Sequence, residues 1–171
     1  MRAADSVAPL ADLLAILDET IILTLASLDA DGSPRATPLY FALQTASDPA
    51  VTDAGASLNS DVEAPFAFLF LSDPDSVHIR NVEREPHCSV AAYPAESDWR
   101  RLRGVQAKGV VGAVAEADRQ DAMAVYRRRV TAVDDVPAAV ARSRLYRIRP
   151  TWIRCIDNRL GFGHRQEWTW R

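Results

Sequence analysis

Apolar residues change their spacing along the chain, and this change separates predicted helices from predicted strands. Four leucines between residues 10 and 17 recur at helical spacing, which predicts an N-terminal helix over about residues 8–18. An unbroken apolar run over residues 21–28 is typical of a buried strand. A turn rich in Asp, Gly and Pro follows, and a second strand over residues 35–44 completes a hairpin. Pro38 interrupts that strand, so one side of it is not expected to be fully paired.

The remaining strands are short apolar runs bounded by turn residues. The strand predicted over residues 104–114 contains three glycines, which suit a barrel corner or the close approach of a flat ligand. Counting the hairpin, the pattern predicts about six strands, and the later ones are residues 66–71, 88–93, 104–114 and, closing the sheet, 144–150 with 151–157.

Helical segments are inserted at two further places. Ser72 and Asp73 before Pro74 predict a capped helix that begins there and continues to about residue 85, where Pro86 ends it. The later helical segments are residues 117–130 and a short turn or helix within 133–140.

The order of elements predicts a mainly β protein with flanking helices. Strands joined mostly by hairpin-like connections do not fit the regular alternation of a parallel sheet, and they favour an antiparallel barrel. The length of 171 residues suits a single domain over residues 1–171. Residues 45–64 are small, acidic and without periodicity, and we expect them to form a long, exposed, mobile loop.

Composition excludes several classes of protein. A net charge of −3 argues against a nucleic-acid binder, although arginines crowd the last third. We expect a solvated, salt-bridged helix to account for Arg127 to Arg129. Cys88 and Cys155 lie far apart in apolar runs, which favours buried free thiols over a disulfide, and no cluster suggests a metal site. Neither a signal sequence nor a membrane-spanning run is evident, so we expect a cytoplasmic protein with no membrane partner.

The stretch FLSDPDSVHIRN offers the strongest local chemistry. A strand ends and a helix begins there, and free backbone N–H groups at a helix start favour an anion. His78 and Arg80 would add positive charge and Asn81 an amide donor. The alternative is that Ser72 or Asp73 only caps the helix while His78 lies on the surface.

Two weaker candidates lie elsewhere. Arg35 at the start of a strand suits a phosphate, or it points only into water. Trp99 with Gln106 suits the edges of a planar ligand, although a core tryptophan and a surface glutamine are equally consistent. The three histidines show no Ser-His-Asp spacing, which gives no case for a hydrolase.

Together these segments resemble a known family. The hairpin ending PRATPLYF, the stretch FLFLSDPDSVHIRNVEREPHCSVAAY and the strand WRRLRGVQAKGVV are similar in order and spacing to the FMN-binding split barrel of the pyridoxamine 5′-phosphate oxidase-like family. The resemblance runs from about residue 21 to the C-terminus and implies a six-stranded antiparallel split β-barrel. The closing DNRLGFGHRQEW resembles the tail of a poorly characterised subgroup.

The resemblance implies a phosphate end for the cofactor site. Arg35 and Thr37 would line the flavin and its phosphate. Ser76 and His78 would hold the phosphate, with Asn81 in the helix below them. His78 stands where the family often has lysine, so we expect FMN affinity to fall as pH rises.

The resemblance also implies a ring end that two subunits share. Leu71 and Ser72 would lie beside the ribityl chain and the ring edge, and Gln106 would face the isoalloxazine. Because the fold binds FMN between the subunits of a homodimer, part of each site would come from the partner. The candidates are Trp99, Trp152 or the tail, in which Asn158, Arg159, His164 and Trp168 would cap a cofactor or substrate at the dimer seam. A C-terminal strand that only packs Phe162 and Trp168 into the partner is the alternative for the tail.

The implied function is that of an FMN-binding flavoprotein, an oxidoreductase that acts on an unidentified small molecule. Vitamin B6 oxidation is not expected, because the Arg/His pair that grips pyridoxine phosphate has no match. No residue is assigned as an acid or base, since the flavin would carry the chemistry. The alternatives are haem, with His78, His87 or His164 as the iron ligand, a deazaflavin (F420) cofactor, or a non-enzymatic flavin carrier or sensor.

Overall fold

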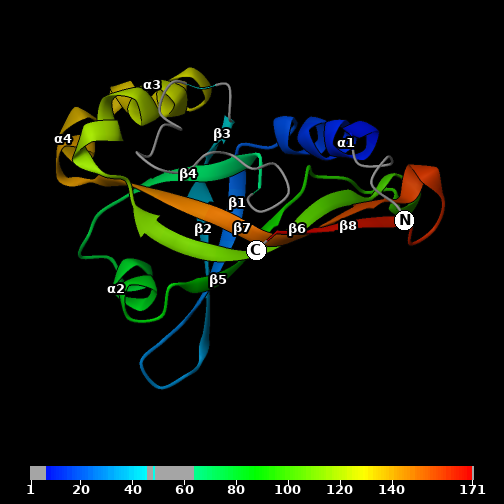
Figure 1. Ribbon diagram of the computed structural model, residues 1–171, viewed down its shortest axis with the longest axis horizontal. Helices are drawn as coiled ribbons and strands as arrows, with labels where there is room; N and C mark the ends of the chain where they lie inside the picture. Colours follow the sequence, from blue (N-terminus) through cyan, green and yellow to red (C-terminus); the bar gives the residue numbers. More distant parts are fainter. Residues whose placement is uncertain (1–6, 46–47, 49–63, 171) are drawn as a thin grey trace.

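The computed structural model describes residues 7–45, 48 and 64–170. Its centre is one eight-stranded antiparallel sheet with the strand order β2-β1-β5-β6-β7-β4-β3, and β8 pairs with β7 beside this path (Figure 1). The strands are β1 (Ile22–Leu28), β2 (Pro34–Tyr40), β3 (Ala42–Thr45), β4 (Phe66–Ser72), β5 (His87–Ala92), β6 (Arg103–Ala113), β7 (Arg144–Asp157) and β8 (Arg165–Thr169).

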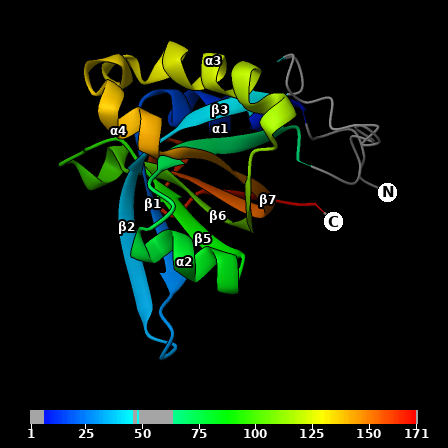
Figure 2. The same cartoon turned by 90° about the vertical axis from the view of Figure 1, so that its left-hand side faces the viewer.

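Helices cover two sides of this sheet. Both views show α1 and α3 on one side, whereas α2 lies on the opposite side (Figures 1 and 2). The helices are α1 (Val7–Asp18), α2 (Val77–Arg84), α3 (Arg119–Arg129) and α4 (Pro137–Arg142), with short 3₁₀ turns at Trp99–Arg101, Glu116–Asp118, Thr131–Asp135 and Asn158–Leu160. No helix in the described ranges is long and apolar enough to cross a membrane.

The sheet curls because of a break at Phe41. The predicted second strand, residues 35–44, is in fact two strands separated by this one residue, whose side chain is fully buried. β2 pairs with β1 and β3 pairs with β4, so consecutive strands lie at opposite ends of the strand order. One residue can join those two ends only if the sheet bends back on itself. The predicted antiparallel split barrel is therefore confirmed, with eight strands rather than six.

The other changes in strand count come from the C-terminal third. Residues 144–157 form one continuous strand, which pairs with β6 along its length. A shift of register between Lys108 and Gly109 lies opposite Pro150, which cannot donate to the ladder. A Cβ atom on Gly109 would lie 2.5 Å from the Arg149 carbonyl oxygen, so the predicted close approach is one of the chain to itself. The tail adds β8 beside β7.

The described residues form two hydrophobic core clusters. One fills the inside of the curled sheet and includes Leu25, Phe68 and Ile148, each fully buried. The other lies under α3 around Leu69 and Tyr126. Burying each large side chain of this kind contributes about 1.5–3 kcal/mol, which holds the strands that carry the polar groups described below.

Two predictions about side chains are confirmed here. Cys88 and Cys155 are buried free thiols, and burial raises the pKa of Cys88 to about 12 and that of Cys155 to about 11. The three arginines that end α3 make the expected ion pairs, Arg127 with Asp134, Arg128 with Asp48 and Arg129 with Asp18. Most of the predicted mobile loop, residues 45–64, lies outside the described residues, and Thr45 belongs to β3.

Candidate functional site

Three polar side chains converge where β4 ends and α2 begins. The Ser72 Oγ lies 2.8 Å from His78 Nε2 and 3.3 Å from the Ser76 Oγ, and the Ser76 Oγ lies 3.3 Å from the same ring nitrogen. Ser72 is buried, and the other two side chains are partly exposed. We call Ser72, Ser76 and His78 the α2 cluster.

The local fold that builds this cluster differs from the predicted one. β4 continues to Ser72, which pairs with Arg144, and the Asp73 Oδ1 accepts from the Asp75 backbone N–H in the turn that follows. The helix begins at Val77 with Ser76 as its N-cap, so the prediction of a start at residues 72–74 was wrong. The Ser76 side chain makes no capping hydrogen bond. The first N–H groups of α2 therefore have no side-chain cap, which is the arrangement that accepts an anion.

Hydrogen bonds connect Arg35, Asp29 and Asn81 next to the α2 cluster. Arg35 Nε and Nη2 donate to the two Asp29 carboxylate oxygens at 2.7 and 2.8 Å, and Asn81 Nδ2 donates to Asp29 Oδ1 at 2.6 Å. The hydrogen bonds from Arg35 and, to a smaller extent, the one from Asn81 lower the pKa of Asp29 to about 2. Asn81 is buried and also donates to the Ser27 Oγ at 3.2 Å. Asn81 thus ties α2 to β1.

Two physical effects lower the pKa of His78. Burial lowers the pKa of His78 below its ordinary value of 6.5, because the imidazolium loses hydration, and the positive charge of Arg35 lowers it further. A negatively charged ligand at the cluster would act in the opposite direction and favour the imidazolium.

Thr37 lies on β2, and Leu71 lies on β4, the strand that ends at the α2 cluster. Thr37 pairs with Leu25 across the β1–β2 hairpin and is half-buried. Leu71 pairs with Leu145 and packs against the core cluster under α3.

A second group of predicted residues lies on the outer face of the sheet. Gln106 and Trp152 line a hollow of about 470 Å³ together with Lys108 and Arg154. The Trp152 ring has the Lys108 Nζ at 5.6 Å and the Arg154 Cζ at 5.1 Å from its centroid. Glu167 accepts from Arg154 Nε at 2.9 Å. The rest of the lining comes mostly from β1 and β5 and includes the small side chains Thr24, Ala26, Ser89 and Ala91.

A third group lies at the far end of the sheet from α2. Asn158 Nδ2 donates to the Trp99 carbonyl oxygen at 2.7 Å, which joins two 3₁₀ turns. Arg159 pairs with Asp157 at 2.6 Å. Phe162 is 84% exposed, and its ring centroid lies 5.4 Å from that of Trp99.

The backbone of the tail turns at two glycines. Gly161 and Gly163 have φ angles of +128° and +72°, which favour glycine. Trp168 packs against the core of its own chain.

The structure brings together only part of the predicted site. Val111 donates to the carbonyl oxygen of Pro86, just after α2, whereas Arg103, eight residues earlier in β6, pairs with Asp157. At about 3.3 Å per residue, the third group lies roughly 26 Å from α2. Within one chain, Trp99, Asn158 and Arg159 therefore do not reach the α2 cluster.

Sequence reasoning missed Asp29. In the sequence, Asp29 is simply one residue of the predicted hairpin turn. Its position next to Arg35 depends on the strand register, in which Ser27 pairs with Arg35. The signal was an aspartate six residues before an arginine across a tight turn. Among the described residues, no group of His, Cys, Asp or Glu is arranged to hold a metal ion.

Comparison with known proteins identifies the family and the fold. The family model described as pyridoxamine 5′-phosphate oxidase matches residues 11–157. No curated protein matches the chain.

Solved structures share the fold at low sequence identity. A haem-binding protein from Mycobacterium smegmatis aligns with a TM-score of 0.66 and 22% identity over 90% of this chain, which spans only 55% of that protein. The conserved hypothetical protein Rv2991 from Mycobacterium tuberculosis aligns with a TM-score of 0.65 and 21% identity, over 96% of this chain and 94% of that one. An F420 reductase aligns with a TM-score of 0.53 and 18% identity, over 81% and 93%. At these identities the likeness shows the fold alone.

Proposed function

Because the chain belongs to the pyridoxamine 5′-phosphate oxidase family of split barrels, we propose that it is a homodimeric flavoprotein that binds FMN noncovalently and oxidises or reduces a small molecule. The observation that carries the proposal is the α2 cluster at a helix start without a side-chain cap. Haem and F420 bound by structural relatives remain alternatives for the cofactor.

The residues at this site fit a phosphate group. Two hydroxyls and an imidazole nitrogen lie within 3.3 Å of one another beside uncapped backbone N–H groups. Ser72 and Ser76 would donate hydrogen bonds to phosphate oxygens. His78 would hold a proton at Nε2 and donate it in a hydrogen bond to the same phosphate. Arg35 adds positive charge, and Asp29 fixes its orientation.

FMN, when bound, would supply the electron or hydride transfer that the protein side chains do not. The chain itself would anchor the phosphate at α2 and orient the ring. The outer-face hollow would receive the planar part of a cofactor, with Gln106 as a polar contact and Trp152 at its edge. Lys108 and Arg154 would place positive charge there. We assign no catalytic residue.

The spacing of the predicted residues supports the homodimer. The Trp99 turn lies roughly 26 Å along β6 from the end of α2, so within one chain it does not contribute to the α2 cluster. Residues at both ends can share a cofactor only if they come from different subunits. The open outer face, lined by small side chains, suits a second copy of the chain.

One observation favours haem as a second candidate. The Nε2 of His164 in the tail is buried and has no hydrogen-bond partner among the described residues. An imidazole nitrogen without a hydrogen-bond partner can bind iron. His87, by contrast, is well exposed and lies 2.5 Å from Glu85.

A visible absorption spectrum of the purified protein tests the cofactor first. Chromatography after heat denaturation should release FMN near one per chain, and FMN added to the apoprotein should bind. Ser76→Ala should weaken this binding by about tenfold or more, since one hydrogen bond to a charged group is lost, while Ser97→Ala on an exposed turn should not. A protein that ignores FMN and gives a Soret band with haemin would replace the proposal by the haem alternative.

Mixed dimers test the shared site. One variant carries Ser76→Ala with His78→Gln, and the other carries Trp152→Ala, because Trp152 is a residue expected to come from the partner. If each cofactor contacts both subunits, each variant alone binds FMN weakly, and after subunit exchange in an equal mixture one of the two sites in each mixed dimer recovers tight binding, which is about a quarter of all sites. No recovery in dimers shown to be mixed would mean that each chain builds its own site.

A further inference from the structure

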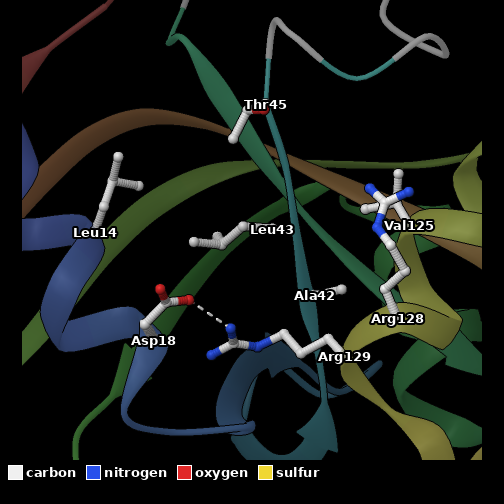
Figure 3. Close-up of a pocket in the computed structure, with 8 residues that line it drawn as sticks. All are labelled: Leu14, Asp18, Ala42, Leu43, Thr45, Val125, Arg128 and Arg129. Atoms are coloured by element: carbon white, nitrogen blue, oxygen red, sulfur yellow. Dashed lines mark hydrogen bonds and ion pairs between the residues drawn. The ribbon is translucent and has the colours of Figure 1, made fainter.

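A slot on the opposite side of the sheet from α2 combines an apolar floor with arginine side chains at its rim. It lies between α1 and α3, over the edge strand β3, and has a volume of about 340 Å³ (Figure 3). This volume falls within the range of small-molecule sites. The lining residues are Leu14, Asp18, Ala42, Leu43, Thr45, Val125, Arg128 and Arg129.

We propose that this slot binds a small monocarboxylate with an apolar body, such as a medium-chain fatty acid, with its carboxylate on Arg128. The apolar body would lie on Leu14 of α1, Leu43 of β3 and Val125 of α3, which face the slot from three elements (Figure 3). β3 is four residues long, so the floor measures roughly 13 Å, enough for an extended chain of this class.

Arg128 is placed to meet a carboxylate at the rim. Its Nη2 donates to Asp48 Oδ1 at 2.7 Å, while Asp48 Oδ2 accepts from the Thr45 backbone N–H at 2.9 Å. This chain of bonds holds the guanidinium over the end of β3. The Arg128 side chain is 62% exposed, and its other N–H groups have no partner among the described residues. A guanidinium with its donors arranged as a fork matches a carboxylate.

Arg129 forms the closed end of the slot. Its Nη1 donates to Asp18 Oδ1 at 2.6 Å, and its Nη2 donates to the carbonyl oxygens of Leu17 and Thr20, the latter at 2.7 Å. These bonds tie α3 to the end of α1, so the two walls of the slot are held together. The Nε of Arg129 is buried without a partner in the described part of the chain, which leaves one donor for a polar ligand atom or water.

The charges around the slot select for a single negative charge. Arg128 and Arg129 are each paired with a carboxylate, Asp48 and Asp18 respectively. A ligand with one charge can share Arg128 with Asp48, whereas a doubly charged phosphate would meet stronger repulsion from both aspartates. This separates the slot from the phosphate-like α2 cluster in chemistry as well as in position.

Titration with octanoate, followed by amide chemical shifts of the full chain, tests the proposal. We expect saturable shifts confined to β3, the end of α1 and the end of α3, with a Kd of about 1 mM or tighter. Arg128→Gln should weaken binding by about three- to fivefold, as for an exposed ion pair. The matched control is Arg127→Gln on the same helix, because Arg127 pairs with Asp134 and does not line the slot. The neutral probe octanamide should bind more weakly than octanoate.

A second pair of variants keeps the test independent of the rim. Leu14→Glu places a carboxylate in the slot and should abolish octanoate binding, while Ala15→Glu makes the same charge change at an exposed position of α1 and should not. The shifts should be the same with and without saturating FMN, so failure of the flavin proposal leaves this one standing. Absence of saturable shifts at about 10 mM octanoate, or equal losses in Arg127→Gln and Arg128→Gln, would overturn it.

Discussion

Replacing His78 by lysine should tighten FMN binding at alkaline pH and remove most of its dependence on pH. The pKa of His78 in the free protein lies below 6.5, because of burial first and the Arg35 charge second. A bound phosphate favours the imidazolium, so the pKa of His78 rises on binding and a proton is taken up. Wild-type affinity therefore increases as pH falls through the window between these two pKa values, and it is lowest above the window.

The size of the effect follows from the contacts. His78 Nε2 lies 2.8 Å from the Ser72 Oγ, within reach of the same anion that the serines would hold. A neutral imidazole already donates a hydrogen bond to the charged phosphate, and lysine adds an ion pair at a partly exposed position, which contributes about 1 kcal/mol. Near pH 8 the lysine variant should therefore bind FMN more tightly by about 1 kcal/mol, or about fivefold. Below the pKa of His78 in the complex, where its imidazole is charged, the two proteins should agree within about twofold.

Quenching of flavin fluorescence at constant ionic strength measures both affinities across this range. The phosphate has its own ionisation near pH 6, which affects both proteins alike, so the ratio of the two Kd values isolates His78. His78→Gln should lose the pH-dependent gain without adding charge. His87→Lys is the matched control, since His87 is 78% exposed in its side chain and lies outside the α2 cluster. Riboflavin, which lacks the phosphate, should not distinguish any of the variants.

The same ratio of Kd values at every pH would refute the reasoning, because His78 would then not exchange a proton on binding. Equal effects of His87→Lys and His78→Lys would show that only the net charge of the protein matters.

Three further outcomes are expected from the structure. Gly109→Ala should lower the free energy of unfolding by about 2 kcal/mol in urea titrations, because its Cβ would lie 2.5 Å from a backbone carbonyl oxygen, while Gly112→Ala, with nothing within 4 Å, should stay within about 0.5 kcal/mol; equal stability of the two would contradict the packing described. The free energy of unfolding should fall as pH drops from about 4 to about 2, because the pKa of Asp29, about 2, lies below its ordinary 3.8. In acid unfolding, the free energy of unfolding of Asp29→Asn should decrease less steeply over this range than that of the wild type. Native Cys88 and Cys155 should resist a thiol reagent that labels both in urea, since burial raises the pKa of each; rapid labelling of the folded protein would show that they are accessible.

Local patterns predicted most of the elements. The helical spacing of leucines located α1 to within one residue, and apolar runs located β1, β4, β5 and β6. The period of apolar residues is a local property, so one sequence suffices to find it. The start of α2 was misplaced because Ser72 and Asp73 suit a cap, yet pairing with Arg144 keeps Ser72 in the strand. Tertiary pairing overrode a local preference there.

The candidate site was only partly visible in the sequence. Ser72, Ser76 and His78 lie within seven residues, so a strand that ends and a helix that begins bring them together without help from distant segments. Asp29 comes into contact with Arg35 and Asn81 only because the hairpin has a particular register and α2 packs on β1. Distance along the chain carried no sign of that contact.

The sequence by itself determined the strands and helices, their antiparallel connections, the buried thiols and the hydroxyl-rich helix start, because each depends on neighbouring residues. Only the tertiary structure decided that the chain breaks at Phe41, so that β2 and β3 reach opposite ends of a curled sheet. It also decided that Trp99 and Asn158 lie far from α2, and that α1 and α3 enclose a slot over β3. Such arrangements depend on the pairing and packing of segments distant in sequence, which the period of a single segment does not specify.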